Sequence, residues 1–105
     1  MREPKEPVER SETLRQGLLR HLEQSPCTAR DLSELLGVKE REIPSHLEHL
    51  ERTLRRSGKR LAVRPAECLG CGFVFRKRTR LTKPGACPSC RGQRIEPPLF
   101  SVEQV

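Results

Sequence analysis

Four of the five cysteines in the sequence form two close pairs, Cys68-x2-Cys71 and Cys87-x2-Cys90, with fifteen residues between them. A gap of two residues lets a tight loop point both thiolates at one ion, and a second such loop completes a tetrahedron. This spacing is typical of a four-cysteine zinc site. We therefore expect one structural Zn²⁺ on Cys68, Cys71, Cys87 and Cys90.

Other uses of these cysteines fit the sequence less well. The opening stretch "MREPKEPVER" is charged and has no apolar run behind it, so we expect a reducing cytoplasm, where disulfides are disfavoured. Redox chemistry of the thioredoxin type would need only one pair. Iron stays open as an alternative metal, because four thiolates also hold a single iron. A closed four-thiolate site leaves no position for substrate, which argues against metal catalysis. No nucleophile–base pairing or phosphate loop appears in the sequence, so we expect no enzyme.

A strongly basic arm joins the two cysteine pairs. Its five cations, which fall within eight residues, are Arg76, Lys77, Arg78, Arg80 and Lys83. Like charges this close repel one another unless an anionic partner is present. The whole chain carries a formal charge of +7, which a zinc tetrathiolate would lower to about +5. We expect a nucleic-acid partner rather than a membrane, with the arm on the phosphate backbone or an adjacent minor groove.

The first half of the chain must supply the elements that position this arm. Hydrophobic residues make up only 33% of the 105 residues, so the core will be thin and a metal staple is expected. Leucines at helical spacing predict a first helix from Ser11 to the "SPC" at 25–27. In "TARDLSELLGV", a capping box of Thr28 and Asp31 predicts a second helix that ends at Gly37. Its expected buried face comprises Leu32, Leu35 and Leu36.

A third helix is predicted by an apolar stripe and should end near 57–58. The stripe consists of Ile43, Leu47, Leu50 and Leu54. Helix, short turn and longer helix make a helix-turn-helix pattern, although a plain three-helix bundle has the same periodicity. Pro44 lies just inside the third helix, so either the helix begins near Ile43 after a tighter lead-in or its first turn is bent.

The outward face of this third helix is rich in hydrogen-bond donors. We predict that it lies in the major groove of double-stranded DNA, with contacts from Arg41, Ser45, His49, Arg52 and Arg56. The alternative is a solvated face held by ion pairs one turn apart, such as Glu48–Arg52 and Glu51–Arg55.

Two strand patterns follow the helices. Residues 59–65, "KRLAVRP", alternate with Leu61 and Val63 inward, and "PLFSVEQV" near the end is a second candidate. "FVF" predicts a further strand after the first cysteine pair, with Phe73 and Phe75 on one face. The predicted fold is α+β: a three-helix winged helix-turn-helix with the four-cysteine zinc ribbon inserted at the wing. Its expected parts are a disordered tail (1–10), helices and first wing strand (11–64), ribbon (65–94), and return strand (95–105).

Over about residues 11 to 103, the chain resembles a prokaryotic family of predicted transcription regulators. In that family a winged helix-turn-helix carries a rubredoxin-like zinc ribbon in place of the wing tip. The resemblance rests on "DLSELLGV", "IPSHLEHLERTLRRSGKRL" and "CLGCGFVFRKR…CPSCRG". It implies zinc on the four paired cysteines and DNA binding by the third helix.

The expected function is therefore that of a DNA-binding transcriptional regulator. Such regulators are commonly homodimers, although no long dimerising helix is visible in this sequence. The alternative is an adaptor that docks through its ribbon on the transcription or translation machinery. Single-stranded RNA fits less well, because stacking aromatics are nearly absent from the chain.

Overall fold

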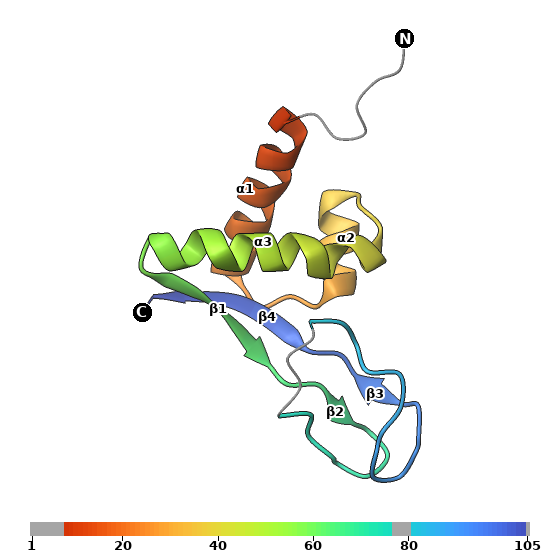
Figure 1. Cartoon of the computed structure of the whole chain (residues 1–105). Coiled ribbons are helices and arrows are strands. Elements are labelled where there is room, and N and C mark those ends of the chain that lie inside the picture. The colour runs from red at the N-terminus through yellow and green to blue at the C-terminus, as the bar shows by residue number, and fades with distance from the viewer. Residues whose placement is uncertain (1–7, 77–80, 105) are drawn as a thin grey trace.

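A computed structural model describes residues 8–76 and 81–104 of the chain. In order, its elements are α1 (Val8–Gln24), α2 (Ala29–Leu36), the 3-10 turn η1 (Glu40–Glu42), α3 (Ile43–Arg56), β1 (Lys59–Arg64), β2 (Glu67–Cys68), β3 (Ile95–Glu96) and β4 (Leu99–Gln104). The helices pack over the antiparallel pair β1–β4, and the segment with β2 and β3 extends beyond one end of that pair (Figure 1). The fold is α+β, as predicted.

Helix α1 begins at Val8, three residues before the predicted start at Ser11. The expected disordered tail of residues 1–10 is therefore wrong for its last three residues, and residues 1–7 lie outside the described part of the chain. No proline or glycine follows Pro7 until Gly17, and Glu and Arg are good helix formers, so the helix continues back to Val8. One face of α1 packs on the core through three buried leucines, spaced one helical turn apart: Leu14, Leu18 and Leu22.

Helix α2 has the predicted caps. Thr28 Oγ1 accepts a hydrogen bond from the amide of Asp31, and the carboxylate of Asp31 accepts one from the amide of Thr28, both at 3.0 Å. Gly37 ends the helix with a left-handed φ of 69°. This conformation is strained for residues that have a Cβ atom, which glycine lacks. Leu32 is fully buried, but Leu35 is 53% exposed, so its predicted place in the core is wrong. Within residues 8–76 and 81–104, α2 packs on α1 and α3, and neither helix covers Leu35.

The start of α3 resolves the alternative posed by Pro44. The 3-10 turn η1 forms the tighter lead-in and α3 begins at Ile43, which places the proline in the first helical turn. A missing backbone donor is tolerated there, because the first amides of a helix have no partner within it. The predicted stripe is confirmed, since all of its members are at most 2% exposed: Ile43, Leu47, Leu50 and Leu54.

The strands β1 and β4 pair with Leu61 opposite Val102 and Val63 opposite Phe100. Phe100 is fully buried, and its backbone exchanges two hydrogen bonds with Cys27 in the α1–α2 connection. Leu61 is buried as predicted, but Val63 is 41% exposed and its predicted inward position is wrong. In Figure 1, β1 begins beside the end of α3 and runs away from that helix, and Val63 is the fifth of the six residues of β1.

The ribbon between β1 and β4 has a small core of its own, formed by Ala66, Cys68, Cys87 and Ile95. The predicted "FVF" strand is reduced to a single bridge between Glu67 and Val74. Phe73 and Phe75 do share a face, because their rings meet edge to face at 5.0 Å. Ile95 and Glu96 pair with β2, so the return strand begins at Leu99 rather than at residue 95. None of the helices in the described residues is long and apolar enough to cross a membrane.

The packing of α2 gives a matched test of the core. Leu32→Ala should lower the free energy of unfolding by about 2–5 kcal/mol, because it removes fully buried methyl groups and leaves a cavity. Leu35→Ala makes the same chemical change on the same helix at a side chain that is 53% exposed, so its effect should be within about 1 kcal/mol. Urea unfolding of the two variants measures both values, and equal losses would contradict this placement of α2.

Candidate metal centre and basic surface

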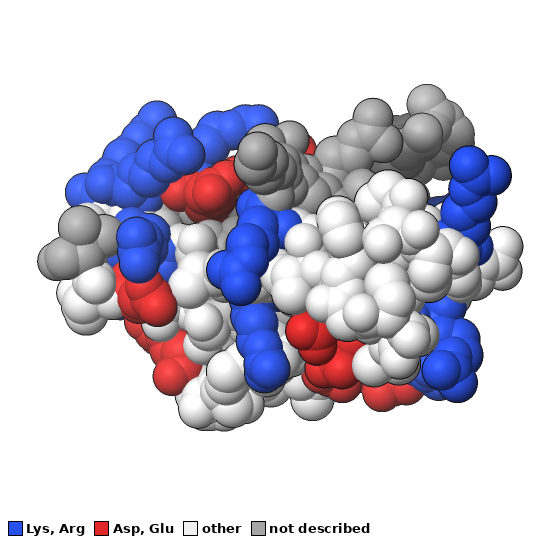
Figure 2. All heavy atoms as spheres, turned by 90° about the horizontal axis from the view of Figure 1, so that it is seen from below, with Lys and Arg blue, Asp and Glu red and all other residues white. Residues whose placement is uncertain are grey.

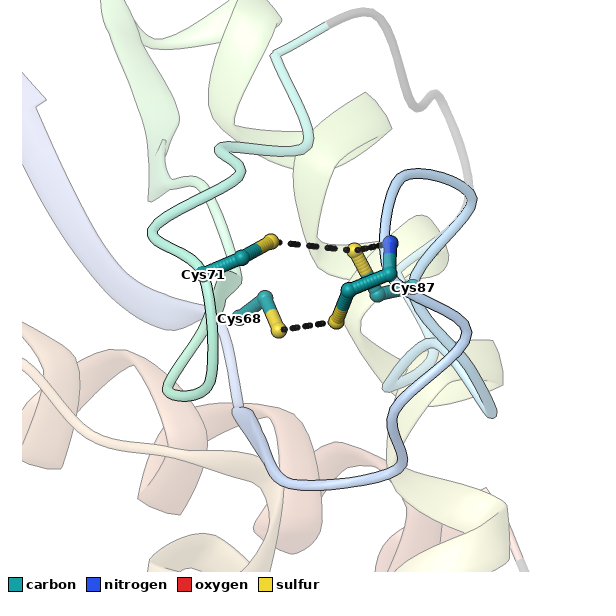
Figure 3. A group of neighbouring side chains, drawn as sticks. Cys68, Cys71 and Cys87 are labelled. Carbon is teal, nitrogen blue, oxygen red and sulfur yellow. Dashed lines mark hydrogen bonds between the residues drawn. The ribbon is translucent and has the colours of Figure 1, made fainter.

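The side chains of Cys68, Cys71, Cys87 and Cys90 converge on one point. Their four Sγ atoms all lie within 4.8 Å of one another, and the pairs Cys68–Cys90 and Cys71–Cys87 are each 3.6 Å apart. In Figure 3, Cys68 and Cys71 project from one loop towards Cys87 on the other. A tetrahedral ion with metal–sulfur bonds of about 2.3 Å needs sulfurs roughly 3.8 Å apart, so the cluster has the size of a metal site.

The two cysteine loops repeat one backbone pattern. The carbonyl of the first cysteine accepts a hydrogen bond from the amide four residues later, from Gly72 to Cys68 (2.9 Å) and from Arg91 to Cys87 (2.8 Å). The residue that donates this hydrogen bond has a positive φ in both loops, 83° at Gly72 and 63° at Arg91. Glycine adopts this conformation freely, whereas a residue with a side chain is strained by about 1–2 kcal/mol. The fold therefore holds Arg91 in a conformation that suits glycine.

Backbone amides surround the sulfurs in both loops. Gly70 donates to Sγ of Cys68 and Ser89 donates to Sγ of Cys87, each at 3.3 Å, and Gly92 donates to Sγ of Cys90 at 3.4 Å. Hydrogen bonds donated to sulfur favour the thiolate over the thiol. The loops therefore stabilise the form of cysteine that binds metal ions.

The pKa values reflect these donors. The amide of Cys71 lowers the pKa of Cys68 to about 7, with a smaller contribution from the amide of Gly70. Burial raises the pKa of Cys87, but the amides of Cys90 and Ser89 outweigh it, so that pKa is lowered. The amide of Gly92 lowers the pKa of Cys90, but the neighbouring side chains of Cys68 and Cys71 raise it to about 11. Because the four sulfurs lie so close together, all four cysteines can be thiolates at the same time only if a cation lies between them.

The donor set fits a closed structural metal site. All four donors are sulfur, which suits Zn²⁺ or a single iron ion. Cys68 and Cys87 are buried, while Cys71 and Cys90 lie at the surface. Four protein ligands fill a tetrahedral ion, so the bound ion would link the two loops and leave no position for a substrate.

The fifth cysteine stays apart from this cluster. Cys27 is 5% exposed and packs in the helical core. Burial raises the pKa of its thiol, and the nearby charge of Asp31 raises it further. Cys27 is therefore a protonated packing residue of the helical core.

The predicted DNA contacts divide into described and undescribed residues. Every described one is exposed: Arg41, Ser45, His49, Arg52, Arg56, Arg76 and Lys83. Lys77, Arg78 and Arg80 lie outside the described residues. Arg41 and Lys83 come together across one groove, whereas Arg52 and Arg56 lie near the other end of α3. The structure thus places these cations at more than one site.

Ion pairs do not hold the outward face of α3. In residues 8–76 and 81–104, neither Glu48–Arg52 nor Glu51–Arg55 forms a pair, so the alternative of a salt-bridged face lacks its expected contacts. The described cations that do pair lie elsewhere: Arg30 with Glu34, Lys59 with Glu23, and Arg60 with Glu103. Figure 2 shows Lys and Arg side chains gathered at the end of the molecule where α3 runs into β1.

Two features of the site were missed from the sequence. One is the positive φ of Arg91, which the unequal spacing of glycine after the two cysteine pairs could have indicated. The other is Leu81, which packs against the main helical core although it belongs to the basic arm. Its signal was present, because Leu81 is the one apolar residue of "RKRTRLTK".

Comparison with known proteins finds two adjacent matches along the chain. Residues 13–62 match the family model described as PF0610-like, N-terminal, and residues 65–105 match the PF0610 rubredoxin-like zinc beta-ribbon domain. A search of curated proteins gave no significant match.

A solved structure matches the chain over its full length. The solution NMR structure of protein PF0610 from Pyrococcus furiosus superposes with a TM-score of 0.77 at 26% sequence identity. The match covers 100% of this chain and 99% of that chain. The chain is therefore similar to a PF0610-like N-terminal domain followed by a rubredoxin-like zinc ribbon, whose four clustered cysteines could hold a metal ion.

Proposed function

We propose that the protein is a DNA-binding transcriptional regulator in which a structural zinc ion stiffens a basic ribbon. In this proposal α2, the turn at 37–39 and α3 act as a helix-turn-helix, and β1 with β4 acts as its wing. The ribbon replaces the tip of the wing. The observation that carries the proposal is the set of exposed arginines on α3, which form no ion pair with any described residue.

Helix α3 is suited to the major groove because its apolar, buried face is separate from its polar, exposed face. Four apolar side chains attach one face to the core, which leaves Ser45, His49, Arg52 and Arg56 exposed on the rest of the helix. Arg and Ser can donate to base edges and phosphates. Because these arginines form no ion pair with described residues, binding to phosphate would not first break a pair.

The metal ion would contribute to DNA binding indirectly, by making the ribbon rigid. The ribbon core is formed by only four buried residues, two of them cysteines, so it has little apolar area to stabilise it. A metal ion supplies folding free energy to such small domains. Zinc is favoured over iron by the family model, which describes a zinc ribbon. Held in this way, Arg76 and Lys83 would reach the DNA backbone as fixed charges.

A second function is favoured by a separate observation. Leu69 is 56% exposed and Phe73 is 37% exposed, and both belong to the loop that carries Cys68 and Cys71. Exposed apolar side chains on a rigid loop are typical of protein contacts. In this alternative the ribbon docks on a protein of the transcription or translation machinery.

Metal removal should unfold the ribbon more than the helices, because the helical core is a separate cluster. The purified protein should contain one zinc ion per chain and be colourless, whereas ferric thiolate would absorb visible light. A strong chelator should collapse the amide chemical-shift dispersion of residues 66–75 and 87–96 in ¹⁵N NMR spectra and leave most far-UV helical signal. A metal-free protein with an unchanged ribbon spectrum would contradict the metal's structural role.

Zinc affinity should fall as the pH falls. Cys68 (pKa about 7) and Cys90 (pKa about 11) are both protonated in metal-free protein at pH 6, and binding as thiolates must release those protons. With at least two protons released, the affinity should drop about a hundredfold or more for each pH unit below about 6. Competition with a zinc chelator of known pH dependence measures this slope. A slope near zero would mean that the site does not bind as thiolates.

DNA binding can be tested by removing cations from α3 and, as a control, from α1. The double variant Arg52→Gln/Arg56→Gln should bind a mixed-sequence duplex about tenfold more weakly at low salt, with the salt dependence reduced by about two contacts. Arg20→Gln removes one exposed cation from α1 and should have little effect. Fluorescence anisotropy over a series of salt concentrations measures both quantities.

The same experiment separates the two functions. Absence of salt-dependent binding by the parent protein would overturn the DNA proposal. The adaptor function would be supported if Leu69→Ser and Phe73→Ser abolish binding to purified RNA polymerase or ribosomes while the arginine variants leave nucleic-acid affinity unchanged.

A further inference from the structure

A groove of about 590 Å³ lies between the helical core and the ribbon arm. One wall comes from the N-terminal ends of α2 and α3 with η1, and the other from residues 81–83 and the two prolines before β4. Small-molecule sites commonly have volumes of about 300–1,000 Å³ and lie between domains. The size and place of this groove therefore suit a small ligand.

The floor of the groove is apolar and fixed. It includes Pro44 of α3, Pro97 and Pro98 before β4, and Leu81 of the arm. Pro98 is buried and Leu81 packs against the helical core, so neither is free to swing away. Proline has no backbone donor and a restricted φ, so these walls offer a ligand rigid contact area rather than hydrogen bonds.

The rim of the groove is cationic. Arg41 of η1 and Lys83 of the arm lie on its two walls, and neither forms an ion pair with a described residue. Arg30 also lines the groove but lies 3.7 Å from Glu34, and Glu40 is the one acidic residue of the lining. Three cations and one carboxylate leave the groove with a positive balance, which favours an anionic group.

We propose that this groove binds a small organic anion with a flat apolar body, such as an aromatic carboxylate. Its ring would lie on the proline and leucine floor, and its carboxylate would face Arg41 and Lys83. A bound molecule of this kind touches both the helical unit and the ribbon arm, so it would act as an effector that joins them. This role goes beyond DNA binding and does not require it.

DNA backbone is the competing occupant of the groove, and the lining fits it less well. A sugar–phosphate chain is charged and hydrated, and it would place polar groups against Pro44, Leu81 and Pro97. Burying polar groups without hydrogen-bond partners is unfavourable. An aromatic carboxylate satisfies the floor and the rim together.

The test uses 2-naphthoate as the probe and its neutral analogue 2-naphthamide as the matched control, titrated into the zinc-loaded full chain. Naphthoate should shift the ¹⁵N NMR signals of Arg41, Leu81 and Lys83 and bind at least about tenfold more tightly than naphthamide, because the carboxylate makes charge-assisted hydrogen bonds. The double variant Arg41→Gln/Lys83→Gln should lose about tenfold in affinity for naphthoate, whereas Arg20→Gln on α1 should keep it.

Three results would overturn the proposal. They are the absence of naphthoate binding tighter than about 1 mM, equal affinities for naphthoate and naphthamide, and shifts confined to residues outside the groove. A double variant that weakens duplex DNA binding but leaves naphthoate affinity unchanged would assign the groove to the DNA backbone instead. Naphthoate binding in the groove without any DNA binding would support the effector site and overturn only the DNA function.

Discussion

The convergence of four sulfur atoms is the constraint on which the ribbon depends. Two loops that are separated along the chain bring Cys68, Cys71, Cys87 and Cys90 within 4.8 Å of one another. Without a cation, four such thiols compete for protons, as the opposed pKa changes of Cys68 and Cys90 indicate. A divalent ion removes that competition and links the loops, which the few apolar residues of the ribbon could not do alone.

The ribbon is also attached to the helical unit at two places. At its base, the chain leaves through Arg64 of β1 and returns through Leu99 of β4, and these residues are paired across the sheet. Along its arm, Leu81 packs against the helical core. Two attachments restrict rotation of the ribbon relative to α3 more than either one alone. Lys83, two residues after Leu81, therefore has a defined position relative to α3.

Short-range features were predictable from the sequence, because they depend on residues close together in the chain. The cysteine spacing, the capping box of Thr28 and Asp31, and the turn at Gly37 are of this kind. The exposure of Leu35 and Val63 was not predictable, since it depends on which distant element covers each side chain. The groove between Arg41 and Lys83 was missed for the same reason: its walls come from segments about forty residues apart in the chain.

The described cations fall into two groups, those that pair with a carboxylate and those that do not. Lys59 and Arg60 lie where β1 meets α1 and β4, and each pairs with a carboxylate at 2.8 Å. Arg41, Arg52, Arg56 and Lys83 face outward and have no such partner among the described residues. Unpaired like charges repel one another and contribute nothing to the fold. Their positions on η1, on the outward face of α3 and on the ribbon arm are those that the proposed anionic partner would need.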